Sequence, residues 1–209
     1  MKTMIWDFNG TIIDDVQLCI DIENQMVKDW NLQVPFITKE IYQENFCFPV
    51  IHYYQKMGYD LTKVSYEQIS YEFQKRFDQG YQQMDLCLGF QDRVKQFQKE
   101  GYRQVILSAT QQSELDKQVK HLNIDSFFEE VIGIQDNLAH SKVQRAMSWM
   151  ENNQINPEDC TYLGDTDHDY EVAKAIGIDR IYLIAQGHQS ASVLEKTGAC
   201  VLKSLLEWH

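Results

Sequence analysis

A chain of 209 residues, 44% of them hydrophobic, is long enough to bury a core and to form one domain with an insert. Its net charge of -12 argues against non-specific binding to nucleic acids or anionic membranes, which requires a basic surface. No apolar run reaches the roughly 18 residues that a membrane span needs, and we see no signal peptide before the first apolar segment. The five cysteines form no CxxC pair, which favours reduced thiols over disulfides or a zinc site. We therefore expect a cytoplasmic protein without nucleic-acid or membrane partners.

Short apolar segments typical of strands recur along the chain, and helical patterns separate the later ones. The expected strands lie at 2–6, 103–107, 131–134, 160–163 and 180–184. The expected helices between and after them lie at 90–100, 111–122, 141–153 and 169–176. Strands that alternate with helices of this length predict βαβ units. The sequence thus predicts an α/β fold with a doubly wound, Rossmann-like parallel sheet.

This alternation stops between residues 14 and 84. Apolar residues such as Val16, Cys19 and Ile20 fall there at helical spacing, and 65–81 has the pattern of another helix. About half of the aromatic residues of the chain lie in this stretch, enough for a small core of its own. We expect a core of residues 1–13 and 85–209 with a helical insert of residues 14–84. The alternative is one undivided α/β domain.

Polar residues follow several of the expected strands at their carboxyl ends, where open α/β sheets bind ligands. Asp7 follows the first strand, Ser108 the second, and the sequence GDTDHD, with Asp165 and Asp169, the fourth. Lys142 stands near the start of a helix, where the helix dipole disfavours a cation unless it faces a phosphate or carboxylate. Each residue alone has an ordinary explanation as a turn former, a helix cap or a surface charge. Together and in this order they indicate one site.

This ordered set resembles the motifs of the haloacid dehalogenase superfamily, whose members are mostly Mg²⁺-dependent phosphatases with an aspartate nucleophile. The family pattern DxDx[TV] appears as DFNGT from Asp7 to Thr11, Ser108 ends the strand in VILSAT, Lys142 follows, and GDxxxD is Gly164 to Asp169. The resemblance covers nearly the whole chain. It is strongest to phosphoglycolate-phosphatase-like proteins of subfamily I, whose type-one cap is a helical insert like the one at 14–84.

The resemblance implies a nucleophilic Asp7 that forms an aspartyl-phosphate, and two further sets of residues. The first set would hold Mg²⁺ through oxygen atoms: Asp7, the backbone carbonyl of Asn9, Asp165 and Asp169. The second set would contact the substrate phosphate: Ser108, Ala109, Lys142 and Thr11. The implied partner is a small phosphorylated substrate, and the chain is expected to be a monomer or a homodimer.

Asn9 is the one departure from the family pattern. In the phosphatases an Asp at this position protonates the leaving oxygen and later activates water. An amide donates a hydrogen bond but delivers no proton at neutral pH, so we expect catalysis to be slower by roughly 10²–10⁴-fold. The variant Asn9→Asp is expected to gain activity, unless His52 or another residue of the insert supplies the acid.

Three functions remain open at this point. The first is a Mg²⁺-dependent phosphatase, the second a protein that binds a phosphorylated metabolite with little turnover, and the third a non-phosphatase hydrolase of the same fold. A receiver-type phosphoacceptor module is disfavoured, because two acids follow Lys142 in the chain. We interpret His168 and His188 as loop residues, and Asp14 and Asp15 as acids at the start of the first helix of the insert.

Overall fold

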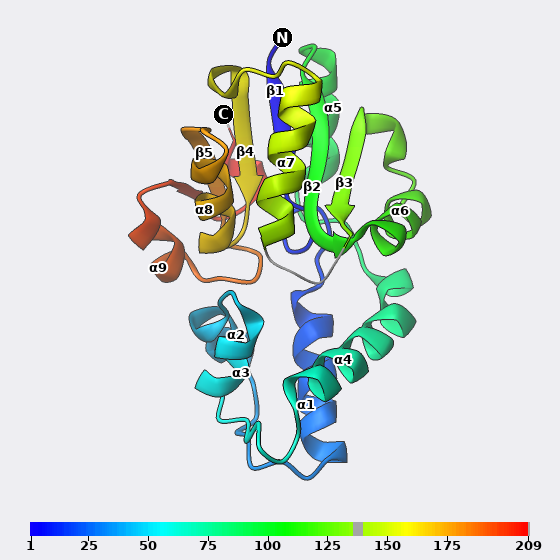
Figure 1. Ribbon diagram of the computed structural model, residues 1–209, viewed down its shortest axis with the longest axis vertical. Helices are drawn as coiled ribbons and strands as arrows, with labels where there is room; N and C mark the ends of the chain where they lie inside the picture. Colours follow the sequence, from blue (N-terminus) through cyan, green and yellow to red (C-terminus); the bar gives the residue numbers. More distant parts are fainter. Residues whose placement is uncertain (136–139, 209) are drawn as a thin grey trace.

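Six parallel strands form a single sheet in the order β3-β2-β1-β4-β5-β6 (Figure 1). The computed structural model describes residues 1–135 and 140–208. The strands are β1 (Thr3–Trp6), β2 (Arg103–Gln111), β3 (Glu130–Ile134), β4 (Cys160–Gly164), β5 (Arg180–Ile184) and β6 (Cys200–Leu202). The five expected strands and the α/β class are confirmed. The edge strand β6 was not expected, because its apolar run, Cys200–Leu202, is only three residues long.

Helices cover both faces of the sheet, as strands with two buried faces require. They are α5 (Phe90–Lys99), α6 (Gln112–His121), α7 (His140–Asn152), α8 (Asp167–Ala175) and the short α9 (Ala191–Leu194). Met4 and Trp6 point to the face covered by α5 and α6, whereas Ile5 points to the face covered by α7 and α8. This alternation is the two-residue period of a strand. The four expected helices of this part are confirmed to within two residues at each end.

Four further helices lie between β1 and β2 in the sequence, and we call them the cap. They are α1 (Val16–Asp29), α2 (Lys39–Asn45), α3 (Val50–Lys56) and α4 (Tyr66–Gly80). Figure 1 shows them beyond the carboxyl ends of the strands. Helix α4 begins with a capping box in which Ser65 and Gln68 satisfy each other's backbone N–H groups. The cap therefore faces the edge of the sheet where ligands bind in such folds.

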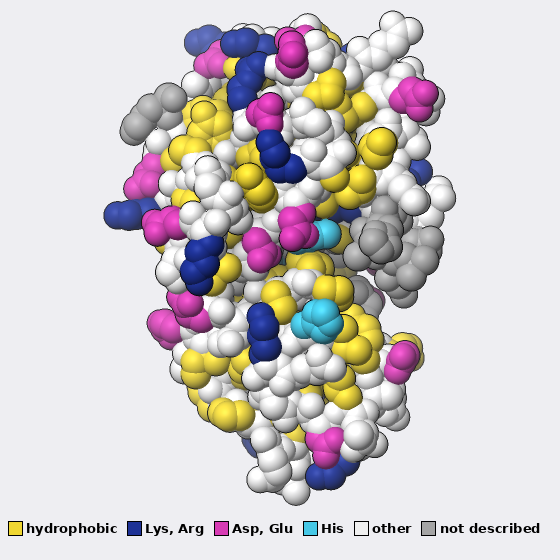
Figure 2. Space-filling model, turned by 60° about the vertical axis from the view of Figure 1, so that its left-hand side comes forward, with side chains coloured by type: hydrophobic (Ala, Val, Ile, Leu, Met, Phe, Trp, Pro, Cys, Tyr) yellow, Lys and Arg dark blue, Asp and Glu magenta, His cyan; other side chains and the backbone are white. Residues whose placement is uncertain are grey.

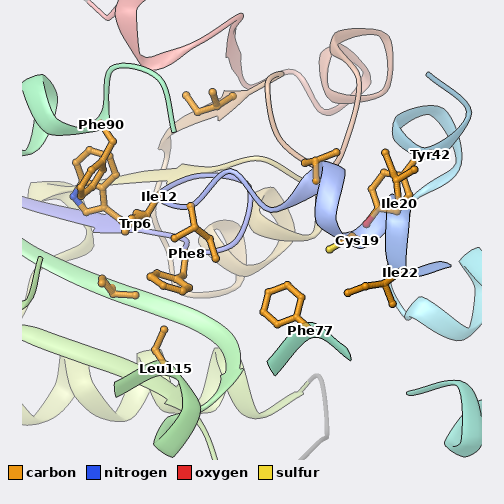
Figure 3. Packing of buried hydrophobic residues seen from close by; sticks show 14 of the residues in the cluster. Trp6, Phe8, Ile12, Cys19, Ile20, Ile22, Tyr42, Phe77, Phe90 and Leu115 are labelled. Atoms are coloured by element: carbon orange, nitrogen blue, oxygen red, sulfur yellow. The ribbon is translucent and has the colours of Figure 1, made fainter. Parts of the chain in front are cut away.

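One hydrophobic cluster runs through the sheet and the cap. It includes Trp6 and Phe90 beside the sheet, Phe8 after β1, and Phe77 and Tyr42 in the cap (Figure 3). Because this packing is continuous, the boundaries of the insert at residues 14 and 84 stay a prediction. Among the described helices, none has both the length and the apolar composition to cross a membrane.

Candidate active site

Asp7 and Asp165 stand side by side because β1 and β4 are neighbours in the sheet. The chain leaves β1 towards β2 and β3 on one side and then returns to β4 on the other side. Such a reversal of strand order opens a crevice at the carboxyl ends of the two central strands. Gly10, at φ +69°, lets the loop after β1 approach, since a Cβ there would lie 2.2 Å from Oδ2 of Asp165. Asp7 and Asp165 are both buried.

Lys142 joins two of the acids inside the protein. Its Nζ donates to Oδ1 of Asp7 at 2.6 Å and to Oδ1 of Asp169 at 2.8 Å, and the residue is 2% exposed. Burial alone would lower the pKa of Lys142, but Asp169 and Asp7 raise it well above the usual value. The two carboxylates thus offset the unfavourable position of a cation in the first turn of α7. Lys142 thus faces carboxylates, one of the two kinds of anion that the sequence left open, and its contact with a phosphate stays a prediction.

Three carboxylates form a cluster that could hold a cation. Asp7, Asp165 and Asp169 each offer one oxygen, and these oxygens all lie within 4.8 Å of one another. Burial, followed by the negative charge of Asp169, raises the pKa of Asp7 to about 7 despite Lys142. Burial also raises the pKa of Asp165 well above its usual value, although His188 opposes this. When the three acids are ionised, their negative charge exceeds the positive charge of Lys142, and such an oxygen-only donor set fits a hard cation such as Mg²⁺.

Asp169 differs from the other two acids because donors surround both of its oxygens. Oδ1 accepts from Lys142 and from the Tyr162 hydroxyl, and Oδ2 accepts from the Asp165 and Thr166 backbone and from the Thr166 hydroxyl. Burial alone would raise its pKa, but Lys142 and then Thr166 bring the pKa below the usual value. Asp169 therefore fixes Lys142 and the loop after β4, and it would bind an ion only by sharing oxygens that are already hydrogen-bonded.

The remaining atoms expected to meet a substrate lie around Asp7. Among the residues whose side chains are described, 1–135 and 142–208, none donates a hydrogen bond to Oδ2 of Asp7. The ladder between β2 and β3 is interrupted between Leu107 and Gln111, so Ser108 and Ala109 leave the regular pairing at the end of β2. The Ser108 hydroxyl lies 3.1 Å from the hydroxyl of Thr110. These features leave one oxygen of Asp7 open beside irregular backbone.

Thr11 and Asn9 contact protein groups in this structure. The Thr11 hydroxyl donates to Oδ1 of Asp165 at 3.3 Å, so Thr11 orients an acid instead of facing Asp7. The Asn9 amide donates to Asp15 at 2.8 Å and accepts from the Thr110 hydroxyl at 2.9 Å. In the described part of the chain, no donor hydrogen-bonds the Asn9 carbonyl, which leaves that oxygen open as a ligand.

Asp15 does not cap α1 as expected. It occupies the N-cap position, but its side chain makes no capping hydrogen bond and turns towards the loop after β1. It is fully buried and accepts from Asn9, from the Gly10 backbone and from His188. Burial alone would raise its pKa, but His188 first and then Asn9 and Gly10 lower it. The predicted place of Asp15 at the start of α1 is confirmed, but its carboxylate accepts from these partners and not from the helix end.

His188 is a site residue that the sequence interpretation missed. It is 6% exposed, its Nε2 lies 3.2 Å from Asp15, its Nδ1 lies 2.9 Å from the Tyr42 hydroxyl, and its backbone N–H donates to Asp165 at 2.6 Å. Burial alone would lower its pKa, but Asp15, Asp165 and Asp7 raise it to about 9. The only signal in the sequence was its place in the loop after β5, beyond the carboxyl end of a strand.

The cap rests on this same loop. Gln43 of α2 donates to the Gly187 carbonyl at 2.6 Å, and Gln189 donates to the Phe46 carbonyl at 2.9 Å. In Figure 2, His, Asp and Glu side chains gather along the seam between the sheet above and the cap below. His52 is exposed on α3, and among its described contacts none reaches Asp7. The cap thus closes over the carboxylates through loop 185–190.

The sequence matches a family model as well as the motifs. The model described as haloacid dehalogenase-like hydrolase aligns with residues 4–183, which contain Asp7, Ser108, Lys142, Asp165 and Asp169. The chain belongs to the haloacid dehalogenase-like hydrolase family. Among curated proteins, no match to the chain was found.

Solved structures share the fold of this haloacid dehalogenase-like hydrolase at low sequence identity. A predicted phosphatase from Clostridium acetobutylicum has a TM-score of 0.79 at 15% identity, with 99% of this chain and 95% of that chain covered. A haloacid dehalogenase-like family hydrolase from Streptococcus pneumoniae has a TM-score of 0.75 at 20% identity, with coverage of 99% and 96%. A predicted phosphoglycolate phosphatase from Haemophilus somnus has a TM-score of 0.75 at 13% identity, with coverage of 98% and 95%. These likenesses extend over sheet and cap together and concern the fold alone.

Proposed function

We propose that this hydrolase is a Mg²⁺-dependent phosphatase that removes the phosphoryl group of a small metabolite through an aspartyl-phosphate on Asp7. The observation that carries the proposal is the state of the Asp7 carboxylate. Lys142 holds Oδ1 at 2.6 Å, whereas no described donor contacts Oδ2, which is therefore free to attack phosphorus. The match to a hydrolase family supports this function.

The residues around Asp7 supply the charge that phosphoryl transfer requires. Asp7, Asp165 and the Asn9 carbonyl would hold Mg²⁺ together with Asp169, and the ion when bound would offset the charge of the phosphate oxygens. Lys142 stabilises negative charge beside the attacking oxygen. The Ser108 hydroxyl and the Ala109 N–H at the irregular end of β2 would bind phosphate oxygens. Thr11 holds Asp165, and through it the geometry of the acids.

A phosphate-release assay tests the proposal. A panel of phosphorylated metabolites is incubated with Mg²⁺ and the wild type, with and without a chelator, and with the variant Asp7→Asn. We expect release that the chelator and Asp7→Asn both abolish. The variant Asp14→Asn serves as a matched control, because it makes the same chemical change at an exposed residue in the same loop. Release that persists in Asp7→Asn would overturn the assignment of the nucleophile.

A second function has one observation in its favour. Because Asn9 carries an amide that two partners hold, the site could bind a phosphorylated metabolite and turn it over little. Titration calorimetry with Mg²⁺ distinguishes the two functions. Ligand binding without phosphate release over hours would favour the binding protein, and release on the time scale of binding would favour the phosphatase.

A further inference from the structure

The Asn9 side chain is held at both ends. Its Oδ1 accepts from the Thr110 hydroxyl at 2.9 Å, and its Nδ2 donates to Asp15 at 2.8 Å. Thr110 is itself fixed, because its backbone N–H and hydroxyl both contact the hydroxyl of Ser108. The amide carries no acidic proton, and its partners keep it in place. Position 9 is therefore a rigid part of the loop after β1 and not a group that moves protons.

Asp15 explains why position 9 carries an amide. Four donors surround its carboxylate: the Asn9 amide, the Gly10 backbone, the Cys19 thiol and the His188 ring. This environment suits an anion that is fully buried. A carboxylate at position 9 would face it across the same 2.8 Å, where two like charges do not both stay ionised. Asp15 thus selects against an acid at position 9, and the two residues act as a pair.

The two basic side chains near Asp7, Lys142 and His188, have their protons in fixed hydrogen bonds. Lys142 donates to Oδ1 of Asp7 and to Oδ1 of Asp169, so its ammonium group is held between two carboxylates. Both ring nitrogens of His188 face partners, Asp15 and Tyr42. Neither of these two side chains is thus placed to follow a departing oxygen with a proton.

We propose that this site is selective for phosphoryl groups bonded to a weakly basic oxygen, such as that of a carboxylic acid or of a second phosphate. The inference rests on the proposed function, phosphoryl transfer to Asp7. A carboxylate leaving group, with a pKa of about 4, departs as an anion without help. An alkoxide is far more basic than a carboxylate and needs a proton in the transition state.

The reaction balances without an acid in the first step. Oδ2 of Asp7 bonds to phosphorus, the bond from phosphorus to the leaving oxygen breaks, and its electron pair leaves with that oxygen as a carboxylate or phosphate anion. In the second step water bonds to phosphorus, the bond to Asp7 breaks with its pair on the Asp7 oxygen, and the proton of water passes to the released phosphate. Only this second step gains from a base, and it is the same for every substrate.

The test compares kcat/KM for leaving groups of different basicity, because in a two-step reaction this ratio reports the step that expels the leaving group. The wild type with Mg²⁺ is assayed with acetyl phosphate, 2-phosphoglycolate and a series of substituted phenyl phosphates of equal size. We expect kcat/KM to fall steeply as the leaving group becomes more basic. The value for 2-phosphoglycolate should be about 10²-fold or more below that for acetyl phosphate.

A variant that exchanges the side chains of Asn9 and Asp15 is the matched comparison for the wild type. Asn9→Asp/Asp15→Asn keeps one amide and one carboxylate in contact but moves the acid to position 9, two residues after Asp7. It should raise kcat/KM for 2-phosphoglycolate by about 10²-fold or more and flatten the phenyl phosphate series. Asp15→Asn alone should bring no such gain. Asn9→Asp alone should gain less than the exchange, because its carboxylate meets that of Asp15.

The outcomes separate this inference from the proposed function. If the wild type releases phosphate from none of these compounds, the proposed function is wrong. If it releases phosphate from all of them with kcat/KM independent of leaving-group basicity, the function stands and the inference is overturned. A steep series in the wild type supports the inference even if the exchanged variant fails to fold.

Discussion

Replacing Lys142 by methionine removes the cation between Asp7 and Asp169 and keeps the length of the side chain. Both ion pairs are buried, with side chains 3% exposed for Lys142, 10% for Asp7 and 3% for Asp169. Removing one partner of a buried ion pair costs about 3–5 kcal/mol, because it leaves an uncompensated charge. Asp7 can take up a proton, since its pKa is already about 7, so we expect a loss of about 3 kcal/mol at pH 7. The loss should grow towards pH 9, because the pKa of Asp7 rises further without Lys142, so the folded variant holds a proton that the wild type and the unfolded chain have released.

Urea denaturation followed by circular dichroism measures this loss, in buffer without divalent cations. Lys174→Met is the matched control, because Lys174 pairs with Asp179 at the surface, where the side chains are 46% and 84% exposed. Such an exposed pair contributes little to stability. In Lys142→Met/Asp169→Asn, one uncompensated charge is gone, and we expect part of the stability to return. A loss in Lys142→Met no larger than in the control, at an unchanged m-value, would refute the reasoning.

Three further predictions concern Glu23, the metal site and the seam. Burial raises the pKa of Glu23 from 4.5 to about 8, so its contribution to stability is full below pH 4.5 and is lost as the pH rises through 8. At pH 9 the free energy of unfolding from urea denaturation should be higher for Glu23→Gln than for the wild type, by at most about 5 kcal/mol. At pH 5 the variant should not be more stable than the wild type. An equal pH dependence of stability in the two proteins would contradict this prediction. Mg²⁺ at about 100 times its dissociation constant should stabilise the wild type by about 2.7 kcal/mol and should not stabilise Asp165→Asn; an equal gain in both would remove Asp165 from the ligands. Tyr42→Phe should lower the free energy of unfolding by about 1–3 kcal/mol, because the buried Nδ1 of His188 loses its partner. Tyr71→Phe, at an exposed residue, should lower it by almost nothing. Equal losses would show that the contact between Tyr42 and His188 contributes little to stability.

The sheet and the positions of Asp7 and Asp165 could be predicted from the sequence because they depend on local patterns. Apolar runs such as 103–107 and 180–184 predict buried strands, and parallel strands bring their carboxyl ends to one edge. That rule alone indicated that Asp7 and Asp165 would meet. The register between β1 and β4 then sets their distance.

The hydrogen bonds around Asn9 could not be predicted from the sequence, because they depend on contacts that the spacing of residues does not encode. Asp15 directly precedes α1 and has the sequence signature of a cap, yet its partners come from the loop after β1 and from His188, far along the chain. Tyr42 had an equally good explanation as an apolar core residue. The sequence located the nucleophile, but only the packing of cap against sheet explains why position 9 carries an amide.

Identification of the phosphorylated residue tests the central claim most directly. The wild type is mixed with Mg²⁺ and acetyl phosphate, quenched in acid, digested with pepsin and examined by mass spectrometry beside Asp7→Asn. We predict a phosphoryl group on Asp7 in the wild type and none on the corresponding peptide of the variant. A phosphoryl group on another residue, or hydrolysis of acetyl phosphate with no phosphorylated Asp7 at any quench time, would contradict the account.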